Sequence, residues 1–471
     1  MNISLVWIRN DLRLEDNTAL IEAVKDADAD DKILMVFCID PKQLKTGSYS
    51  HDYFFTALNT FYRNCLEKEL AIHFLYGDPQ DCFSKLIKEF PDIQKIYFNI
   101  DDSGYGMVRD CAVRKILEES NVRILDFYDH HLHSANEVLK EDGSHYRVFT
   151  PYYNQWKNRL IRRVQKPDYD KLRKVILKNF AAKGEEGQNK FCEIQEMITT
   201  DFTVQTGEEK AQEILENFVE RHLAEYEEMR DYPYTEGTSR ISKFLSTGQL
   251  SIRQVYQRVE QAPNSKGKET FIKELGWRDF YNMIYHFYPK QKDEEIIEKY
   301  RNIRWEYDES RIEKWKEGKT GFPIVDAAMR QLKEEGWMHN RLRMIVASFF
   351  TKDLLMDWRI GEKYFSEMLI DYDSASNIGG WQWAASVGTD AVPYFRIFNP
   401  NSQSKRFDPE GSFIKKYVKE LRNIPAKYIQ EPFKYTKQIR KECGIDIEKI
   451  YDEPIVNHKK QRLRAIELFQ R

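Results

Sequence analysis

The first 130 residues alternate short apolar runs with longer, charged, helix-like segments. The apolar runs, each short enough for a buried strand, occupy residues 3–8, 33–39, 72–76, 95–98 and 122–127. This alternation is typical of β-α-β units, in which helices cover a parallel sheet. We therefore predict an α/β domain with a Rossmann-like parallel sheet over residues 1–130.

The second half of the chain has a different period. Apolar residues recur three and four positions apart from Ile214 to Tyr226 and again from Ile324 to Leu332, where Pro323 stands in a helix-starting position. We predict an all-α domain over residues 201–471, with a capping box formed by Ser251 and Gln254.

Between these halves, residues 131–200 lose the periodicity. The part from 181 to 190 is polar and contains two glycines, which is typical of an exposed linker. We therefore predict a long interdomain linker over 131–200.

Charge and cysteine content narrow the class of protein. The net charge is −3, from 73 Lys and Arg against 76 Asp and Glu, which leaves room for a basic face and so leaves nucleic-acid binding open. The six cysteines lie singly, so neither a disulfide framework nor a cysteine metal site is predicted. His130, His131 and His133 lack a partner at a useful spacing, and we expect surface or capping histidines and no metal.

The N-terminus points to a compartment. Its apolar run of six residues is followed at once by charges, unlike a signal peptide or a membrane anchor. We expect a cytoplasmic protein that binds no membrane.

Residues 371–390 fit neither an ordinary amphipathic helix nor a strand. They combine acids, an amide, glycines and indoles: Asp371, Asp373, Asn377, Gly379, Gly380, Trp381 and Trp383. Carboxylates and an amide can bond hydroxyl and ring N–H groups, and glycines let a backbone approach a flat ligand. We interpret this stretch as the wall of a site.

Two further clusters suggest ligand contacts. Residues 236–242 place a glycine and three hydroxyl side chains at a loop-to-helix junction, which suits a pyrophosphate or simply caps a helix. Glu274, Trp277, Arg278 and Tyr281 share one helical face at spacings of three and four. Because these four groups are costly to bury together, we expect that face to line a cleft.

Together these motifs resemble the DNA photolyase and cryptochrome family, most closely the class I cyclobutane pyrimidine dimer photolyases. The run Asn-x-Gly-Gly-Trp-Gln-Trp-Ala-Ala-Ser-x-Gly-Thr-Asp from Asn377 resembles the family's flavin-binding core, and the resemblance extends from Trp7 to about Pro432. It implies an antenna-type α/β domain linked to a helical FAD-binding domain. It also implies light-driven repair of UV-damaged DNA containing pyrimidine dimers, by a protein that we expect to be monomeric.

The resemblance assigns FAD contacts. In the family the Gly-Thr-Ser-Arg-x-Ser motif grips the FAD phosphates, and Asn377 matches the residue that faces flavin N5. Phe271 stands where a relative has Trp. The full set is Tyr226, Thr238, Ser239, Arg240, Ile241, Ser242, Phe271, Arg278, Asn340, Arg343, Asp371, Tyr372, Asp373 and Asn377.

An antenna chromophore is a further expectation. In the family, Trp-x-Arg-x-Asp-Leu-Arg, here from Trp7, opens a domain that can hold a folate or a deazaflavin. Residues 103–109 lack the Asn-Glu pair of folate-binding relatives, so the antenna's identity and presence stay open. Alternatively, the charges of residues 9–13 only tie this loop to neighbouring helices.

The resemblance also assigns DNA contacts and catalytic groups. DNA contacts fall on Arg230, Glu274, Trp277, Arg278, Tyr281, Asn340, Arg341, Trp383 and Gln403, within a polar, basic region that also contains Arg396, Lys405 and Arg406. Catalytic roles fall on Glu274, Asn340, Met344 and Asn377, and Trp305, Trp358 and Trp381 match an electron-transfer chain with Trp381 nearest the flavin.

Two alternatives stay open. A (6-4) photolyase would have histidines in place of Asn340 and Met344. A cryptochrome would signal without repair; plant cryptochromes have Asp at the position of Asn377, and many members carry long C-terminal extensions, whereas this chain ends about forty residues after Pro432. Without the resemblance, Met344 would be interpreted as core packing beside Leu342 and Ile345.

Overall fold

The computed structural model describes residues 2–180 and 185–470. The chain forms two compact units. The first contains residues 1–224, 239–289 and 370–375, and the second contains residues 225–238, 290–369 and 376–471. These units are not delimited at residues 130 and 200, so the domain boundaries inferred from the sequence remain a prediction.

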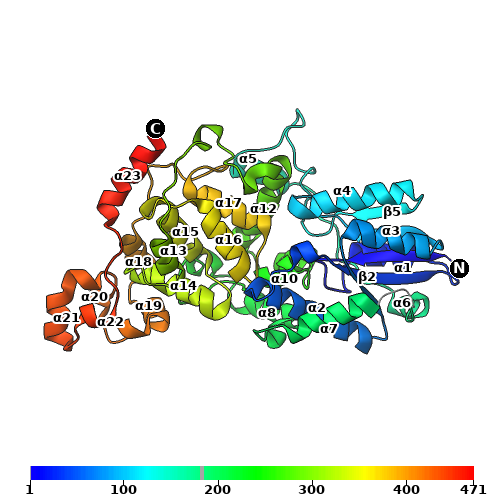
Figure 1. Ribbon diagram of the computed structural model, residues 1–471, viewed down its shortest axis with the longest axis horizontal. Helices are drawn as coiled ribbons and strands as arrows, with labels where there is room; N and C mark the ends of the chain where they lie inside the picture. Colours follow the sequence, from blue (N-terminus) through cyan, green and yellow to red (C-terminus); the bar gives the residue numbers. More distant parts are fainter. Residues whose placement is uncertain (1, 181–184, 471) are drawn as a thin grey trace. The chain divides into compact units, whose positions relative to one another are not determined.

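The first unit contains a parallel sheet with the strand order β3-β2-β1-β4-β5. Its strands are β1 (Ile3–Ile8), β2 (Lys32–Ile39), β3 (Ile72–Tyr76), β4 (Ile93–Asn99) and β5 (Arg123–Phe127). The crossover helices are α1 (Thr18–Asp26), α2 (Tyr49–Glu67), α3 (Pro79–Glu89) and α4 (Gly104–Glu119), drawn beside the sheet in Figure 1. The predicted α/β fold with a parallel sheet is confirmed.

Strand alternation divides the core into two layers. Val6 and Ile8 of β1 join the cluster that includes α1 and α2, whereas Leu5 and Trp7 join the cluster that includes α3 and α4. Successive strand side chains point to opposite faces, so continuous apolar strands imply helices on both faces. This explains why the strands could be located from their apolar runs alone.

The charged loop after β1 ties elements of the first unit together. Arg13 forms an ion pair with Asp129, and Arg253 of α11 (Ile252–Glu260) pairs with Asp129 at 2.6 Å and with Asp16 at 2.8 Å. Burial raises the pKa of Asp129, but Arg13 and Arg253 lower it by more, to well below its ordinary value. The loop's arginines thus perform the structural role that we considered as an alternative to ligand binding.

The segment predicted to be a linker contains regular structure. It holds α5 (Phe149–Trp156), α6 (Tyr169–Val175) and α7 (Glu185–Glu196), while residues 181–184 lie outside the described residues. A Cβ at Gly187 would lie 2.0 Å from the carbonyl oxygen of Phe74, and Phe191 stacks on the Phe74 ring at 4.1 Å. Residues 185–190 are therefore a helix packed closely on β3 and not an exposed linker, because the glycine permits backbone contact.

The predicted surface location of the histidines is wrong for His133. It is 3% exposed, and its ring meets Trp156 edge-on at 5.6 Å. Burial lowers the pKa of His133 and of His131 below the ordinary value. No group of three or more His, Cys, Asp or Glu within residues 2–180 and 185–470 is arranged to hold a metal.

The rest of the first unit is helical. It comprises α8 (Glu208–Arg221), α10 (Ser242–Ser246), α11 and α12 (Lys266–Phe287). The capping box of Ser251 and Gln254 is confirmed at the start of α11.

The described regular elements of the second unit are helices, joined by loops such as residues 386–399. After α9 (Tyr226–Met229) its helices up to residue 385 are α13 (Glu309–Lys316), α14 (Pro323–Glu335), α15 (Asn340–Ser348), a π-helix (Phe349–Asp353), α16 (Trp358–Met368) and all but the first two residues of α17 (Ser374–Ala385). Beyond them lie α18 (Pro400–Phe407), α19 (Ser412–Tyr417), α20 (Ala426–Ile429), α21 (Thr436–Cys443), α22 (Ile447–Ile450) and α23 (His458–Gln470). Pro323 begins α14, as predicted.

The stretch that fitted no ordinary amphipathic helix is largely the helix α17. Ala375, Ile378, Trp381 and Ala384, three positions apart, are each at most 3% exposed. The buried residues also include the polar Gln382, whereas Trp383 is half-buried, so apolar character does not follow burial and the sequence shows no amphipathic period. No described helix is long and apolar enough to cross a membrane.

Candidate active site

Two predicted ligand motifs meet in the first unit. The hydroxyl of Ser242, at the end of the Gly-Thr-Ser-Arg-x-Ser motif, donates to the carboxylate of Asp371 at 2.7 Å. These residues are 129 positions apart in the sequence. The fold therefore places the hydroxyl motif beside the acidic motif of residues 371–373, where Tyr372 lies 4.9 Å from the ammonium of Lys45.

The geometry of residues 239–242 favours ligand binding over helix capping. Within the described residues no side chain caps α10, and Ser242 bonds Asp371 instead. Arg240 adopts a φ of 55°, a left-handed conformation that costs a non-glycine residue about 1–2 kcal/mol. Backbone N–H groups at an uncapped helix start, with hydroxyls beside them, suit a pyrophosphate. The residues present therefore fit the phosphates of FAD, and Asp371 and Asp373 fit its hydroxyl and N–H groups.

One face of α12 carries the predicted DNA-contacting side chains. Glu274, Trp277, Arg278 and Tyr281 are all half-buried, whereas Phe280 on another face is fully buried. The Trp277 ring stacks on Phe149 at 3.7 Å and lies 5.6 Å from Tyr281. The cluster is thus an aromatic platform with a carboxylate and a guanidinium beside it, a surface suited to a planar base.

The buried face of α12 fixes this platform. Asp279 is 1% exposed, and its Oδ2 accepts from Trp156 Nε1 at 2.8 Å and from the His133 backbone N–H at 2.9 Å. Burial raises the pKa of Asp279 to about 7, although these hydrogen bonds oppose the rise. Arg278 donates to the His130 carbonyl. These bonds hold α12 against residues 130–133 and α5.

In the second unit, Asn377 is oriented by a carboxylate. Its Nδ2 donates to Glu362 Oε1 at 3.1 Å, which links α17 to α16. With the amide nitrogen engaged, the Oδ1 atom remains as the acceptor of the side chain. An acceptor of this kind suits a ring N–H of a reduced flavin.

The predicted electron-transfer tryptophans differ in burial. Trp381 and Trp358 are 2% and 0% exposed, and Trp305 is half-buried. Trp358 Nε1 donates to the buried carboxylate of Glu295 at 3.2 Å. A Cβ at Gly361 would lie 2.1 Å from the Trp381 ring, so α16 contacts this ring through a glycine. Two of the three rings are thus locked in the core of this unit.

The start of α15 presents the residues that separate the branches of the family. Asn340 is exposed and Met344 is half-buried, while Leu342 and Ile345 are buried. Met344 is therefore not part of the core stripe, contrary to the packing alternative. Arg341 forms a bidentate pair with Asp231, at 2.8 Å to each oxygen, and lies over the Phe407 ring.

The remaining predicted residues are distributed as follows. In the second unit, Trp383 and Gln403 are half-buried, Arg343 donates to the Met338 carbonyl at 2.8 Å, and Arg230 lies over the Tyr226 ring. Phe271, in the first unit, is 4% exposed and packs on Phe218, and Ile241 and Asp371 are buried as well.

The sequence missed several residues that position the predicted ones. These are Phe149, Asp231, Glu295, Gly361 and Glu362. None of them carried a local signal, because each meets its partner across at least 15 residues of sequence.

The chain is similar to known proteins over its whole length. Residues 4–168 match the DNA photolyase family, and residues 271–471 match the FAD binding domain of DNA photolyase. A deoxyribodipyrimidine photo-lyase of Alkalihalophilus pseudofirmus is 44% identical over 100% of this chain and 98% of its own length. A class III photolyase from Agrobacterium tumefaciens superposes with a TM-score of 0.91 at 31% identity, covering 100% of this chain and 97% of its own. A cryptochrome from Synechocystis gives 0.84 at 26% identity, with 99% of each chain covered. The chain belongs to the DNA photolyase family.

Proposed function

We propose that this protein repairs cyclobutane pyrimidine dimers in DNA in a light-dependent reaction with FAD as its cofactor. The observation that carries the proposal is the half-buried face of α12, where Glu274, Trp277, Arg278 and Tyr281 form an aromatic and charged platform. The relative with 44% identity bears the name of this activity.

We assign the FAD contacts to two groups of residues. Ser239 to Ser242 and Asp371 to Asp373 hold the phosphates and hydroxyl groups, and Asn377, oriented by Glu362, holds the reactive ring. When bound in its reduced form, FAD supplies upon excitation the electron that opens the cyclobutane ring, and accepts it back afterwards.

The platform receives the lesion. Photolyases, like other enzymes that act on bases, take the target out of the duplex, which costs a few kcal/mol and least for a damaged base. Stacking on Trp277, held by Phe149, returns about 1–3 kcal/mol per base. Glu274 and Asn340 donate or accept hydrogen bonds at the pyrimidine edges and stabilise charge on them. Met344 offers an apolar, polarizable contact.

The duplex backbone is bound by polar and cationic residues, among which we assign Arg230, Arg341 and Gln403. Arg341 is held by Asp231, so its guanidinium is preoriented.

Trp381, Trp358 and Trp305 conduct an electron from the surface when the flavin is oxidised. The half-buried Trp305 suits the outermost position.

The alternatives make different predictions. A (6-4) photolyase would need a proton-transferring histidine, and Asn340 and Met344 provide none. A cryptochrome shares the fold, as the Synechocystis structure illustrates, and would bind FAD without repairing DNA.

We also propose a cytoplasmic monomer, in line with six free cysteines. The identity of an antenna chromophore stays a prediction.

The experiment is repair of an oligonucleotide that carries one cyclobutane thymine dimer, using purified protein with chemically reduced flavin. We expect repair in light, none in the dark, and none of a (6-4) lesion. Flavin-loaded protein that leaves the cyclobutane dimer intact in light would reject the lyase and favour the cryptochrome alternative.

A further inference from the structure

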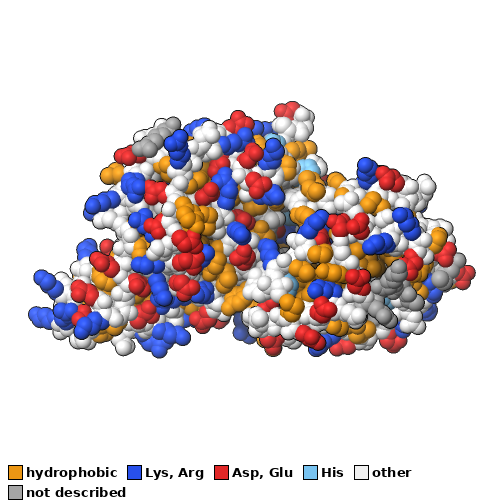
Figure 2. Space-filling model, in the orientation of Figure 1, with side chains coloured by type: hydrophobic (Ala, Val, Ile, Leu, Met, Phe, Trp, Pro, Cys, Tyr) orange, Lys and Arg blue, Asp and Glu red, His pale blue; other side chains and the backbone are white. Residues whose placement is uncertain are grey.

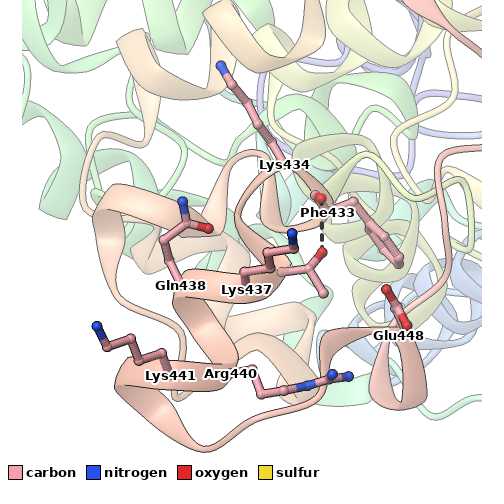
Figure 3. Close-up of a pocket in the computed structure, with 8 residues that line it drawn as sticks. Phe433, Lys434, Lys437, Gln438, Arg440, Lys441 and Glu448 are labelled. Carbon is pink, nitrogen blue, oxygen red and sulfur yellow. Dashed lines mark hydrogen bonds between the residues drawn. The ribbon is translucent and has the colours of Figure 1, made fainter.

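The second unit contains a hollow in which four of the eight lining residues are cations, and none of these residues is assigned above. It lies along α21, has a volume of about 730 Å³, and is lined by Lys434, Lys437, Arg440 and Lys441 with Glu448 as its one carboxylate (Figure 3). We call it the basic hollow. Its polar lining, with a single carboxylate, suits an anion better than an apolar ligand.

Three of the four cations are available for a ligand. Arg440 pairs with Asp446 at 2.6 Å. By contrast, Lys434, Lys437 and Lys441 are exposed, and none forms a salt bridge with any residue in the part of the chain that the structure describes. Glu448 lies in the lining, and Glu431 and Glu442 interact electrostatically with Lys434 and Lys441, so the hollow keeps an excess of positive charge that is smaller than its number of lysines.

The charge density is local. Residues 426–450, which span α20 to α22, contain six Lys and Arg against four Asp and Glu, in a chain whose net charge is −3. Figure 2 shows Lys and Arg side chains gathered over the region where Figure 1 draws α20, α21 and α22. A polyanion approaching this region meets a positive field that the whole chain does not provide.

The basic hollow is joined to α18, which carries the proposed DNA contact Gln403. Lys405 of α18 pairs with Glu431 at 2.6 Å, and the backbone N–H of Lys434 donates to the Glu431 carbonyl at 3.0 Å. Gln430 also donates to the Asp408 carbonyl at the end of α18, at 3.2 Å. The hollow and α18 are thus neighbouring segments of one unit, joined through Glu431 and Gln430.

The spacing of the lysines fits a nucleic-acid backbone. From Lys434 to Lys441 the chain advances about 10 Å, at about 1.5 Å per residue. Duplex DNA carries one charge per about 3.4 Å along each strand, so this length matches about three phosphates of one strand. Because the cations of the hollow are long and flexible, they suit phosphates of any sequence.

We propose that the basic hollow binds the phosphate backbone of duplex DNA, beyond the segment that α18 contacts. The inference rests on the proposed DNA substrate and extends it: the protein holds flanking duplex as well as the lesion. Binding there raises affinity for long DNA and does not affect the chemistry at the dimer.

The test compares a triple variant, Lys434→Gln with Lys437→Gln and Lys441→Gln, against a matched control. The control is Lys85→Gln with Lys88→Gln and Lys115→Gln, three exposed lysines of α3 and α4 that lose the same charge. Affinity is measured for dimer-containing duplexes of about 8 and about 30 base pairs, from 50 to 200 mM salt. Light-dependent repair of the short duplex is measured in parallel.

We expect the triple variant of the basic hollow to bind the long duplex with a weaker salt dependence than the wild type, and to bind the short duplex with an unchanged one. Two to three lost phosphate contacts reduce the slope of log affinity against log salt by about 2 to 3. Between 50 and 200 mM salt, the affinity of the wild type for the long duplex therefore falls by a factor that is about 10 to 40 times larger than the factor for the variant. A slope equal to that of the control variant, or an equal loss on the short duplex, would overturn the proposal. Failure of all proteins to repair the short duplex would instead reject the proposed function.

Discussion

Gly361→Ala should displace Trp381. A Cβ at this position would lie 2.1 Å from Cη2 of the Trp381 ring and 2.5 Å from Cζ3, so the ring must move by about 1 Å or more to reach ordinary contact. Phe365, Phe350 and Trp315 surround the ring at centroid distances of 5.1, 5.9 and 6.1 Å. Since the ring is only 2% exposed, it has no free space in which to retreat.

The magnitude follows from two opposing effects. Overpacking a dense core costs about 1–3 kcal/mol. Replacing a glycine inside a helix by alanine returns about 1 kcal/mol. Gly380→Ala in α17 isolates the second effect, because nothing lies within 4 Å of the added Cβ. The two variants should therefore differ in free energy of unfolding by about 1–3 kcal/mol, with Gly361→Ala the less stable.

The assay is denaturant unfolding of both flavin-free variants and of the wild type. Photoreduction of oxidised flavin in Gly361→Ala is then compared with the wild type, and we expect it to be slower because its proposed first electron donor is displaced. Equal unfolding free energies for the two variants would refute the packing argument. Normal photoreduction in a destabilised Gly361→Ala would refute the role of Trp381.

Three further predictions concern single side chains. The pKa of Asp279 is raised to about 7 in the folded protein, so its contribution to stability is full below about pH 4 and falls by up to about 4 kcal/mol as the pH rises to 7. Asp279→Asn should remove this fall, and an unchanged dependence of the unfolding free energy on pH would contradict the prediction. The effect of pH on stability has the opposite sign at Lys352, because burial lowers the pKa of its ammonium well below the ordinary value and stability therefore rises with pH. Lys352→Met should flatten that rise and stabilise the protein most at low pH. A variant that is less stable than the wild type at low pH would count against this prediction. Trp305→Phe should block photoreduction of oxidised flavin and spare repair by chemically reduced protein, and photoreduction at the wild-type rate would reject the electron-transfer chain.

The central strands β1 and β2 could be predicted because they are buried on both faces and appear as continuous apolar runs. The predicted limits of all five strands agree with the structure to within two residues, although the edge strands β3 and β5 are only partly buried. The largest error of this kind is at β4, where Gln94 and Lys95 interrupt the apolar run although the strand begins at Ile93. Local signals with a defined chemistry, such as the Ser251 capping box, were also recoverable.

What the sequence could not provide are contacts between distant segments. The bonds of Ser242 with Asp371 and of Asn377 with Glu362 depend on tertiary packing. Gly187 was misinterpreted for a related reason: a glycine in a flexible loop and a glycine against a strand look the same in sequence. Buried partners therefore complete a candidate site whose exposed residues the motifs had already suggested.

The most direct test of the central claim is the number of thymine dimers split per absorbed photon by wild-type protein and by Glu274→Ala, both with reduced flavin and saturating short substrate. We predict efficient splitting by the wild type and a lower yield for Glu274→Ala, because the carboxyl group that stabilises charge on the dimer is lost. No splitting by the flavin-loaded wild type would contradict the proposed repair function, and an equal yield for both proteins would contradict the assignment of Glu274 to the dimer.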